Sequence, residues 1–124
     1  MTEVSLRLAA LFAAGGLGTL ARYGVAMGLR SSDFPWGTLV VNAVGSFLFG
    51  LVFEATSQGW SPQLRLVVLT GFMGGFTTFS SFAFETWSLF EQGSFARAGA
   101  NLALQNVAGF LAVAMGVWIA RSWA

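Results

Sequence analysis

The stretch Gly71-Phe72-Met73-Gly74-Gly75-Phe76-Thr77-Thr78-Phe79-Ser80-Ser81-Phe82, residues 71–82, lies inside a long apolar segment and decides how this chain folds. A glycine pair followed by two threonines lowers helix propensity and frees backbone carbonyls. The stretch therefore predicts a helix that is broken near its middle. Irregular backbone at membrane depth is tolerated only where protein buries it or where it lines a wet cavity. The freed carbonyls suit a hard cation such as sodium; a glycine packing kink without an ion is the alternative.

The composition excludes a water-soluble domain. Of 124 residues, 56% are hydrophobic and 9% are charged, with a mean hydropathy of +0.72, whereas soluble chains are about 25% charged. The chain has no cysteine and no histidine, which excludes disulfides, thiol catalysis, the usual zinc and haem sites and histidine general-base chemistry. A net charge of +1 with scattered arginines offers nucleic acid no basic patch. We expect a protein embedded in membrane lipid that is not an enzyme.

Four apolar segments are long enough to cross a membrane, for which about 20 residues of helix suffice. They cover residues 5–28, 36–56, 63–90 and 95–121. We therefore predict an all-α membrane protein, with residues 1–124 forming one domain of four transmembrane helices.

The arginines are balanced between the two ends of the predicted bundle. One side holds Arg7, Arg65 and Arg121, and the other holds Arg30 and Arg97, with Arg22 if it reaches that end. An excess of Lys and Arg on one side normally orients a membrane protein, and this chain has almost none. The balance predicts insertion in both orientations and pairing with an inverted copy as an antiparallel dual-topology homodimer. A single orientation fixed by another feature is the alternative.

Several polar side chains lie inside the apolar segments. Asn42 follows Thr38 at helical spacing, and Asn101 and Gln105 share one face of the fourth segment. Amide donors in a membrane interior can coordinate an anion, or they can bond one helix to another, and both interpretations stay open.

Residues after the predicted break line up on neighbouring helix faces. Phe79, Phe82 and Glu85 are spaced three apart, alongside Thr78 and Ser81. An aromatic ring has a positive edge, so phenylalanines that present their edges to a pore favour an anion without a fixed charge. Ordinary packing is the alternative for these rings.

Three stretches together resemble the Fluc (CrcB) family of bacterial fluoride channels: residues 18–22, residues 37–42 and residues 71–82. The similarity extends over the whole chain in length, segment count and motif order. It implies an antiparallel dual-topology homodimer in the bacterial inner membrane. Such a dimer passes cytoplasmic fluoride outward through two passive pores and holds a central structural sodium ion at the helix break.

The resemblance assigns residues to the fluoride path. Asn42 matches the pore asparagine, and Phe79 and Phe82 match the paired phenylalanines that line the path. The polar track of the fourth helix falls on Asn101 and Gln105, whose identities differ from the hydroxyl-bearing track of the family.

Other family positions are structural. Gly74 and Thr77 match the carbonyls that bind sodium, Arg22 matches the arginine of the first helix, and Glu85 matches the vestibule glutamate.

A narrow fluoride path must replace the water around a small, strongly hydrated ion with hydrogen-bond donors. Besides the Asn42 amide, the candidates are the hydroxyls of Thr38, Thr78, Ser80 and Ser81. The alternative function is a proton-coupled exporter of the small multidrug-resistance type. It requires a membrane carboxylate that exchanges protons, for which only Glu54 and Glu85 are candidates.

Overall fold

The computed structural model describes residues 2–30, 33–57 and 59–123, and within them every regular element is a helix. Helix α1 covers Glu3–Gly28, α2 covers Trp36–Ala55 and α6 covers Phe95–Ser122. The remaining helical stretch, Pro62–Glu91, is divided into α3 (Pro62–Leu66), the π-helical η1 (Val67–Met73), α4 (Gly74–Phe76) and α5 (Phe79–Glu91). In this part of the chain, four helical stretches are long and apolar enough to cross a membrane, which confirms the prediction of four such helices.

The third helical stretch is broken, but not at the glycine pair. Gly74 and Gly75 are helical, and the interruption falls at Thr77 and Thr78, whose φ angles of −82° and −152° combine with ψ angles of 158° and 108°. A β-carbon on Gly75 would overlap the backbone carbonyl of Gly15, so the glycine is needed where α1 approaches. The predicted break is therefore confirmed, and the glycine beside it serves close packing.

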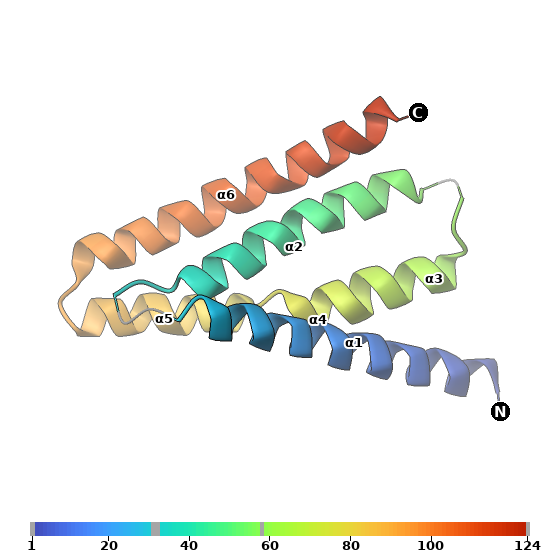
Figure 1. The fold of residues 1–124 in the computed structure, drawn as a ribbon, viewed down its shortest axis with the longest axis horizontal. Coiled ribbons are helices and arrows are strands. Elements are labelled where there is room, and N and C mark those ends of the chain that lie inside the picture. Colours follow the sequence, from blue (N-terminus) through green and yellow to red (C-terminus); the bar gives the residue numbers. More distant parts are fainter. Residues whose placement is uncertain (1, 31–32, 58, 124) are drawn as a thin grey trace.

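Two helix pairs form the bundle. Helix α1 lies against η1 and α4, and α2 lies along α6 (Figure 1). Both pairs depend on small residues: a β-carbon on Gly18 would overlap the Phe72 carbonyl oxygen, and one on Gly116 would overlap the Phe47 carbonyl oxygen. In a membrane, the lipid is as apolar as the side chains, so helices associate by close packing of their backbones at small residues.

The path of the chain fits four successive crossings. Both chain ends lie at one end of the bundle, together with the connection between α2 and α3 (Figure 1). The connections α1–α2 and α5–α6 lie at the opposite end.

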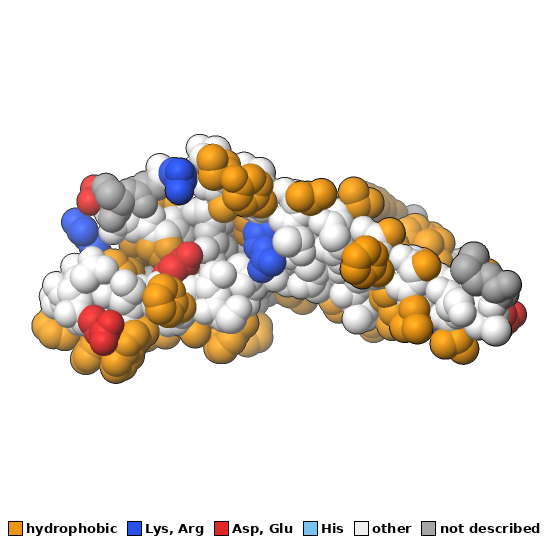
Figure 2. Space-filling model, turned by 90° about the horizontal axis from the view of Figure 1, so that it is seen from below, with side chains coloured by type: hydrophobic (Ala, Val, Ile, Leu, Met, Phe, Trp, Pro, Cys, Tyr) orange, Lys and Arg blue, Asp and Glu red, His pale blue; other side chains and the backbone are white. Residues whose placement is uncertain are grey.

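The surface of the bundle is apolar over most of its length. Figure 2 shows hydrophobic side chains spread along one face, with few charged side chains, most of them toward one end. Helix α1 exposes Phe12, Leu17 and Leu20, and α6 exposes Phe110 and Trp118. Such a surface needs lipid or another apolar surface against it.

Candidate functional site

A groove of about 310 Å³ opens where the helix break meets α2 and α6. Asn42 and Gly45 of α2 line it, together with the break, Phe79 and Phe82 of α5, and Gln105 of α6. The structure thus brings together four of the residues that the sequence predicts for an ion path: Asn42, Phe79, Phe82 and Gln105.

The side chain of Asn42 holds the broken backbone. Its Oδ1 accepts a hydrogen bond from the Thr78 N–H at 2.8 Å, and its Nδ2 donates to the Thr78 carbonyl at 3.0 Å. One amide therefore satisfies both backbone groups of an extended residue that helix geometry leaves unpaired. The remaining Nδ2 hydrogen goes to Gln105 Oε1 at 3.1 Å.

Gln105 comes to the groove from α6 and is 7% exposed. Its Oε1 accepts from Asn42, and its Nε2 has no hydrogen-bond partner within the described part of the chain. A buried amide donor without a protein partner is uncommon and calls for a water or an ion.

Phe79 and Phe82 form an edge-to-face pair beside this amide cluster. Their ring centroids are 5.4 Å apart, and the ring planes meet at 75°. Phe82 is 7% exposed, whereas Phe79 is 76% exposed and lies on the open side of the groove. The Phe82 ring therefore lies in the protein interior, and the Phe79 ring lies at the surface of the groove.

A second cavity of about 300 Å³ lies on the other side of Thr78, which lines both. Thr38, Ser81, Glu85 and Arg22 line this second cavity and do not line the groove. The Thr38 hydroxyl donates to Glu85 Oε1 at 2.7 Å. The residues expected along one path thus fall into two cavities separated by the break.

Thr78 and Ser81 cap the second half of the broken helix. Thr78 Oγ1 accepts from the Ser81 N–H at 3.2 Å and donates to Ser81 Oγ at 3.0 Å. This is the N-cap arrangement that threonine forms at a helix start, and it lets α5 begin directly after the break.

Glu85 extends toward the end of the bundle. It also lines a cavity of about 240 Å³ with Asp33, Pro35 and Ser88, close to the start of α2. Glu85 therefore lies where the second cavity and the cavity at the start of α2 adjoin.

Asn101 is not on the groove, although it shares a helix face with Gln105. Its side chain is 0% exposed, and its Nδ2 donates to Thr86 Oγ1 at 2.8 Å between α5 and α6. Thr86 in turn donates to the Phe82 carbonyl at 2.7 Å. The expected polar track on α6 is thus divided: Gln105 faces the groove, and Asn101 holds α5.

Arg22 reaches into the protein and lies at a helix contact. Its Nη1 donates to the Thr77 carbonyl at 3.4 Å. The neighbouring Gly74 carbonyl would receive the Thr78 N–H in an uninterrupted helix, but that N–H donates to Asn42. In the break, the Gly74 carbonyl lacks its helical donor and the Thr77 carbonyl accepts from Arg22. These are the two carbonyls that the family resemblance assigns to sodium.

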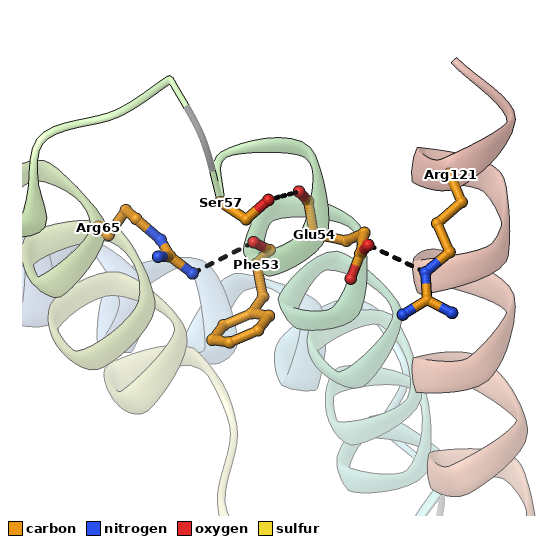
Figure 3. Close-up of polar contacts among 5 residues, drawn as sticks. All are labelled: Phe53, Glu54, Ser57, Arg65 and Arg121. Atoms are coloured by element: carbon orange, nitrogen blue, oxygen red, sulfur yellow. Dashed lines mark hydrogen bonds and ion pairs between the residues drawn. The ribbon is translucent and has the colours of Figure 1, made fainter. Parts of the chain in front are cut away.

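Glu54 lies in the last turn of α2 (Figure 3), whereas Glu85 lines a cavity with residues at the start of that helix. Arg121 Nε donates to Glu54 Oε1 at 2.9 Å, which joins α2 to α6. Beside it, Arg65 Nη2 donates to the Phe53 carbonyl at 3.2 Å, and the Arg65 guanidinium lies 4.7 Å from the centroid of the Phe53 ring. Glu54 thus belongs to a set of contacts between helix ends, away from both cavities.

Comparison with known proteins agrees with this arrangement. A family model described as "CrcB-like protein, Camphor Resistance (CrcB)" matches residues 9–117. The chain belongs to the CrcB family. This confirms the resemblance drawn from the glycine-rich and phenylalanine-rich stretch and from residues 37–42. A CrcB chain with four apolar helices is a multi-pass membrane protein.

Several curated relatives of this CrcB chain are named "Fluoride-specific ion channel FluC". One from Solidesulfovibrio magneticus is 48% identical over 113 residues, 87% of this chain and 90% of that one. Another, from Sorangium cellulosum, is 48% identical over 112 residues, 86% of this chain and 88% of that one. A third, from Burkholderia thailandensis, is 42% identical over 120 residues, 94% of each chain.

Sequence reasoning on this CrcB chain missed Thr86 and the capping role of Thr78. A signal for Thr86 was present, because a threonine four residues after Phe82 in a helix can bond the Phe82 carbonyl. For Thr78 the signal was a hydroxyl three residues before Ser81 at a helix start.

Proposed function

We propose that this chain is a passive, fluoride-selective ion channel and a transporter rather than an enzyme. The observation that carries the proposal is the groove at the helix break, where the Phe79 and Phe82 rings lie beside Gln105, whose Nε2 has no hydrogen-bond partner within the described part of the chain. The relatives named fluoride-specific channels, at 40–48% identity over most of the chain, identify the anion.

The groove offers an anion donors without a fixed positive charge. Hydrogen bonds to an ionised partner are shorter and stronger than those between neutral groups, so one amide donor is worth more to fluoride than to water. Ring edges add a weak positive potential. A larger halide, which holds its hydration less strongly, gains less from these donors and needs more space.

The carboxylates favour a channel over a proton-coupled exporter. Among the described residues, none of those that line the groove is an acid. Glu54 is paired with Arg121 at the far end of the bundle, and Glu85 accepts from Thr38 in the other cavity. With no carboxylate where the rings and amides gather, proton exchange has no group to act through in the groove.

The functional unit we propose is an antiparallel dual-topology homodimer with two pores. Its support is the even distribution of arginines and the open groove, on which 76% of Phe79 is exposed. An inverted second copy would cover this side and give each subunit one enclosed path. The proposed site of action is the bacterial inner membrane, where the dimer lets trapped cytoplasmic fluoride leave the cell.

The same proposal includes a structural sodium ion held by the Gly74 and Thr77 carbonyls. Carbonyl oxygens are the kind of ligand that a hard cation takes. The support is the Thr78 N–H, which bonds Asn42 and so leaves the Gly74 carbonyl without its helical donor. A carbonyl oxygen has two lone pairs, so Thr77 can accept from Arg22 and still serve a cation.

Purified protein in liposomes tests the function. We expect rapid, uncoupled fluoride efflux down an imposed gradient, measured with a fluoride electrode, and little chloride efflux under the same conditions. Absence of fluoride efflux, or equal efflux of both ions, would falsify the assignment.

A further inference from the structure

A groove of about 510 Å³ lies away from the helix break, between the start of α1 and the start of α3. We call it the end groove, because the N-terminus and the connection between α2 and α3 lie together at this end of the bundle (Figure 1). Both helices belong to stretches that can cross a membrane, Glu3–Gly28 and Pro62–Glu91. The end groove therefore lies where two membrane-spanning helices reach the boundary between lipid and water.

The lining of the end groove changes from polar to apolar with distance from the end of the bundle. On α1, Glu3 comes first, Arg7 follows one turn further in, and Ala10 lies deeper still. On the other wall, Ser61 precedes α3 as its N-cap, and Val67 lies more than a turn further in. A phospholipid has the same order, from a charged headgroup to an acyl chain.

The two charged side chains select the kind of headgroup. Glu3 and Arg7 are four residues apart and so lie on one face of α1. Neither belongs to the two ion pairs found within the described part of the chain. The outer carboxylate repels an anionic headgroup and attracts a cationic one, and the guanidinium one turn deeper suits a phosphate.

Phosphatidylethanolamine matches these charges in sign and in order. Its ammonium is at the end of the headgroup, and its phosphate is joined to the glycerol that carries the acyl chains. Ser61 adds a donor for the phosphate: its Oγ accepts from the Leu64 N–H at 3.2 Å, which leaves the hydroxyl hydrogen to donate. A phosphatidylglycerol headgroup has no cation for Glu3, and a phosphatidylcholine headgroup has a cation without an N–H.

The apolar part of the end groove needs a cover. Leu6 and Leu64 line it and are 52% and 45% exposed. A second copy of the chain lying on the groove would also bury Glu3 and Arg7, and burying charges without partners is costly. A lipid covers the leucines with an acyl chain and leaves its headgroup in contact with water.

We propose that the end groove binds a zwitterionic phospholipid with a primary ammonium, of the phosphatidylethanolamine class. Glu3 accepts from the ammonium, Arg7 and Ser61 donate to the phosphate, and one acyl chain lies along the apolar part of the groove. The site is independent of fluoride transport, because it lies apart from the groove at the helix break.

The first test is native mass spectrometry of the wild-type protein with an equimolar mixture of three dioleoyl lipids: phosphatidylethanolamine, phosphatidylcholine and phosphatidylglycerol. We expect phosphatidylethanolamine to be retained about threefold or more over each of the others, as for one partly exposed ion pair. Equal retention of the three lipids, or a preference for phosphatidylglycerol, overturns the inference.

Charge-removing substitutions test the roles of the two side chains. Glu3→Gln should abolish the preference for phosphatidylethanolamine over phosphatidylglycerol, because the outer carboxylate is gone. Arg7→Gln should lower the retention of all three lipids by about three- to fivefold, because each contains a phosphate. Glu91→Gln and Arg30→Gln make the same changes at exposed positions outside the end groove and should bind as the wild type does. Wild-type binding in both Glu3→Gln and Arg7→Gln overturns the inference.

Photocrosslinking identifies the occupant without changing either charge. Leu64 is replaced by p-benzoylphenylalanine, and the protein is illuminated in liposomes of equal parts phosphatidylethanolamine and phosphatidylglycerol. We expect the mass of the adduct to be that of the chain plus phosphatidylethanolamine. A crosslink to a second chain, or equal labelling of the two lipids, overturns the inference.

Discussion

Replacing Asn42 by alanine should destabilise the fold because this one side chain holds the broken helix. The variant removes three hydrogen bonds, two to the Thr78 backbone and one to Gln105. Mutational series give about 1–3 kcal/mol for each buried polar group left unpaired, whereas hydrogen bonds inside membrane proteins average about 0.6 kcal/mol. For two backbone groups and one amide oxygen, we expect the free energy of unfolding to fall by about 2–4 kcal/mol.

Asn106→Ala is the matched control for this variant. Asn106 is exposed, and its Nδ2 donates to the Leu102 carbonyl of its own helix at 2.8 Å. We expect a change of about 0.5 kcal/mol or less there. Unfolding can be followed by tryptophan fluorescence in mixed micelles with rising sodium dodecyl sulfate, at one protein concentration.

Hydrogen exchange locates the effect in the chain. The Thr78 amide should exchange faster in Asn42→Ala than in wild type, because Oδ1 is its acceptor. Equal stability losses in the two alanine variants, or unchanged exchange at Thr78, would show that Asn42 does not hold the break.

Three further predictions concern flux and packing. Phe79→Ile or Phe82→Ile should cut fluoride flux sharply, because the ring edges are lost, while the dimer still forms. Dimerisation is checked by crosslinking. Normal flux in both variants refutes the ring-edge argument. Glu85→Gln should keep most of the flux with no new pH dependence, since an amide oxygen can still accept from Thr38; loss of flux favours the exporter. Gly18→Ala should lower the free energy of unfolding by more than about 1 kcal/mol in the same assay, because the added methyl group meets the Phe72 carbonyl. Gly16→Ala places its methyl group in open space and should be neutral or slightly stabilising. Similar values for the two variants contradict the packing argument.

The helices could be predicted from the sequence because length and apolar content decide whether a segment can cross a membrane. The position of the break could not. Its local signal is the glycine pair, but Gly75 of that pair is also what allows α1 to pack closely. That second use depends on the contact of Gly75 with Gly15, 60 residues away, which the local sequence does not show. The extended residues are the threonines that follow, because Asn42 of another helix satisfies the Thr78 backbone.

The groove residues could be predicted in part. Asn42, Phe79, Phe82 and Gln105 meet there as expected, and Asn101 does not. Helical spacing puts Asn101 and Gln105 on one face of α6, one turn apart. Their neighbours nevertheless differ: Gln105 meets Asn42 of α2, and Asn101 meets Thr86 of α5. Whether the oxygen or the nitrogen of each amide is left without a hydrogen bond depends on whether its partner donates or accepts. Those partners, Asn42 and Thr86, lie on other helices, so the sequence of α6 alone does not show them.

The most direct test of the central claim is the reversal potential of the purified protein in a planar lipid bilayer. Fluoride is set at different concentrations on the two sides, and chloride is set in the opposite gradient. The account predicts a current that reverses at the fluoride equilibrium potential and is insensitive to a pH gradient. A reversal at the chloride potential, a potential that follows the pH gradient, or no current would contradict it.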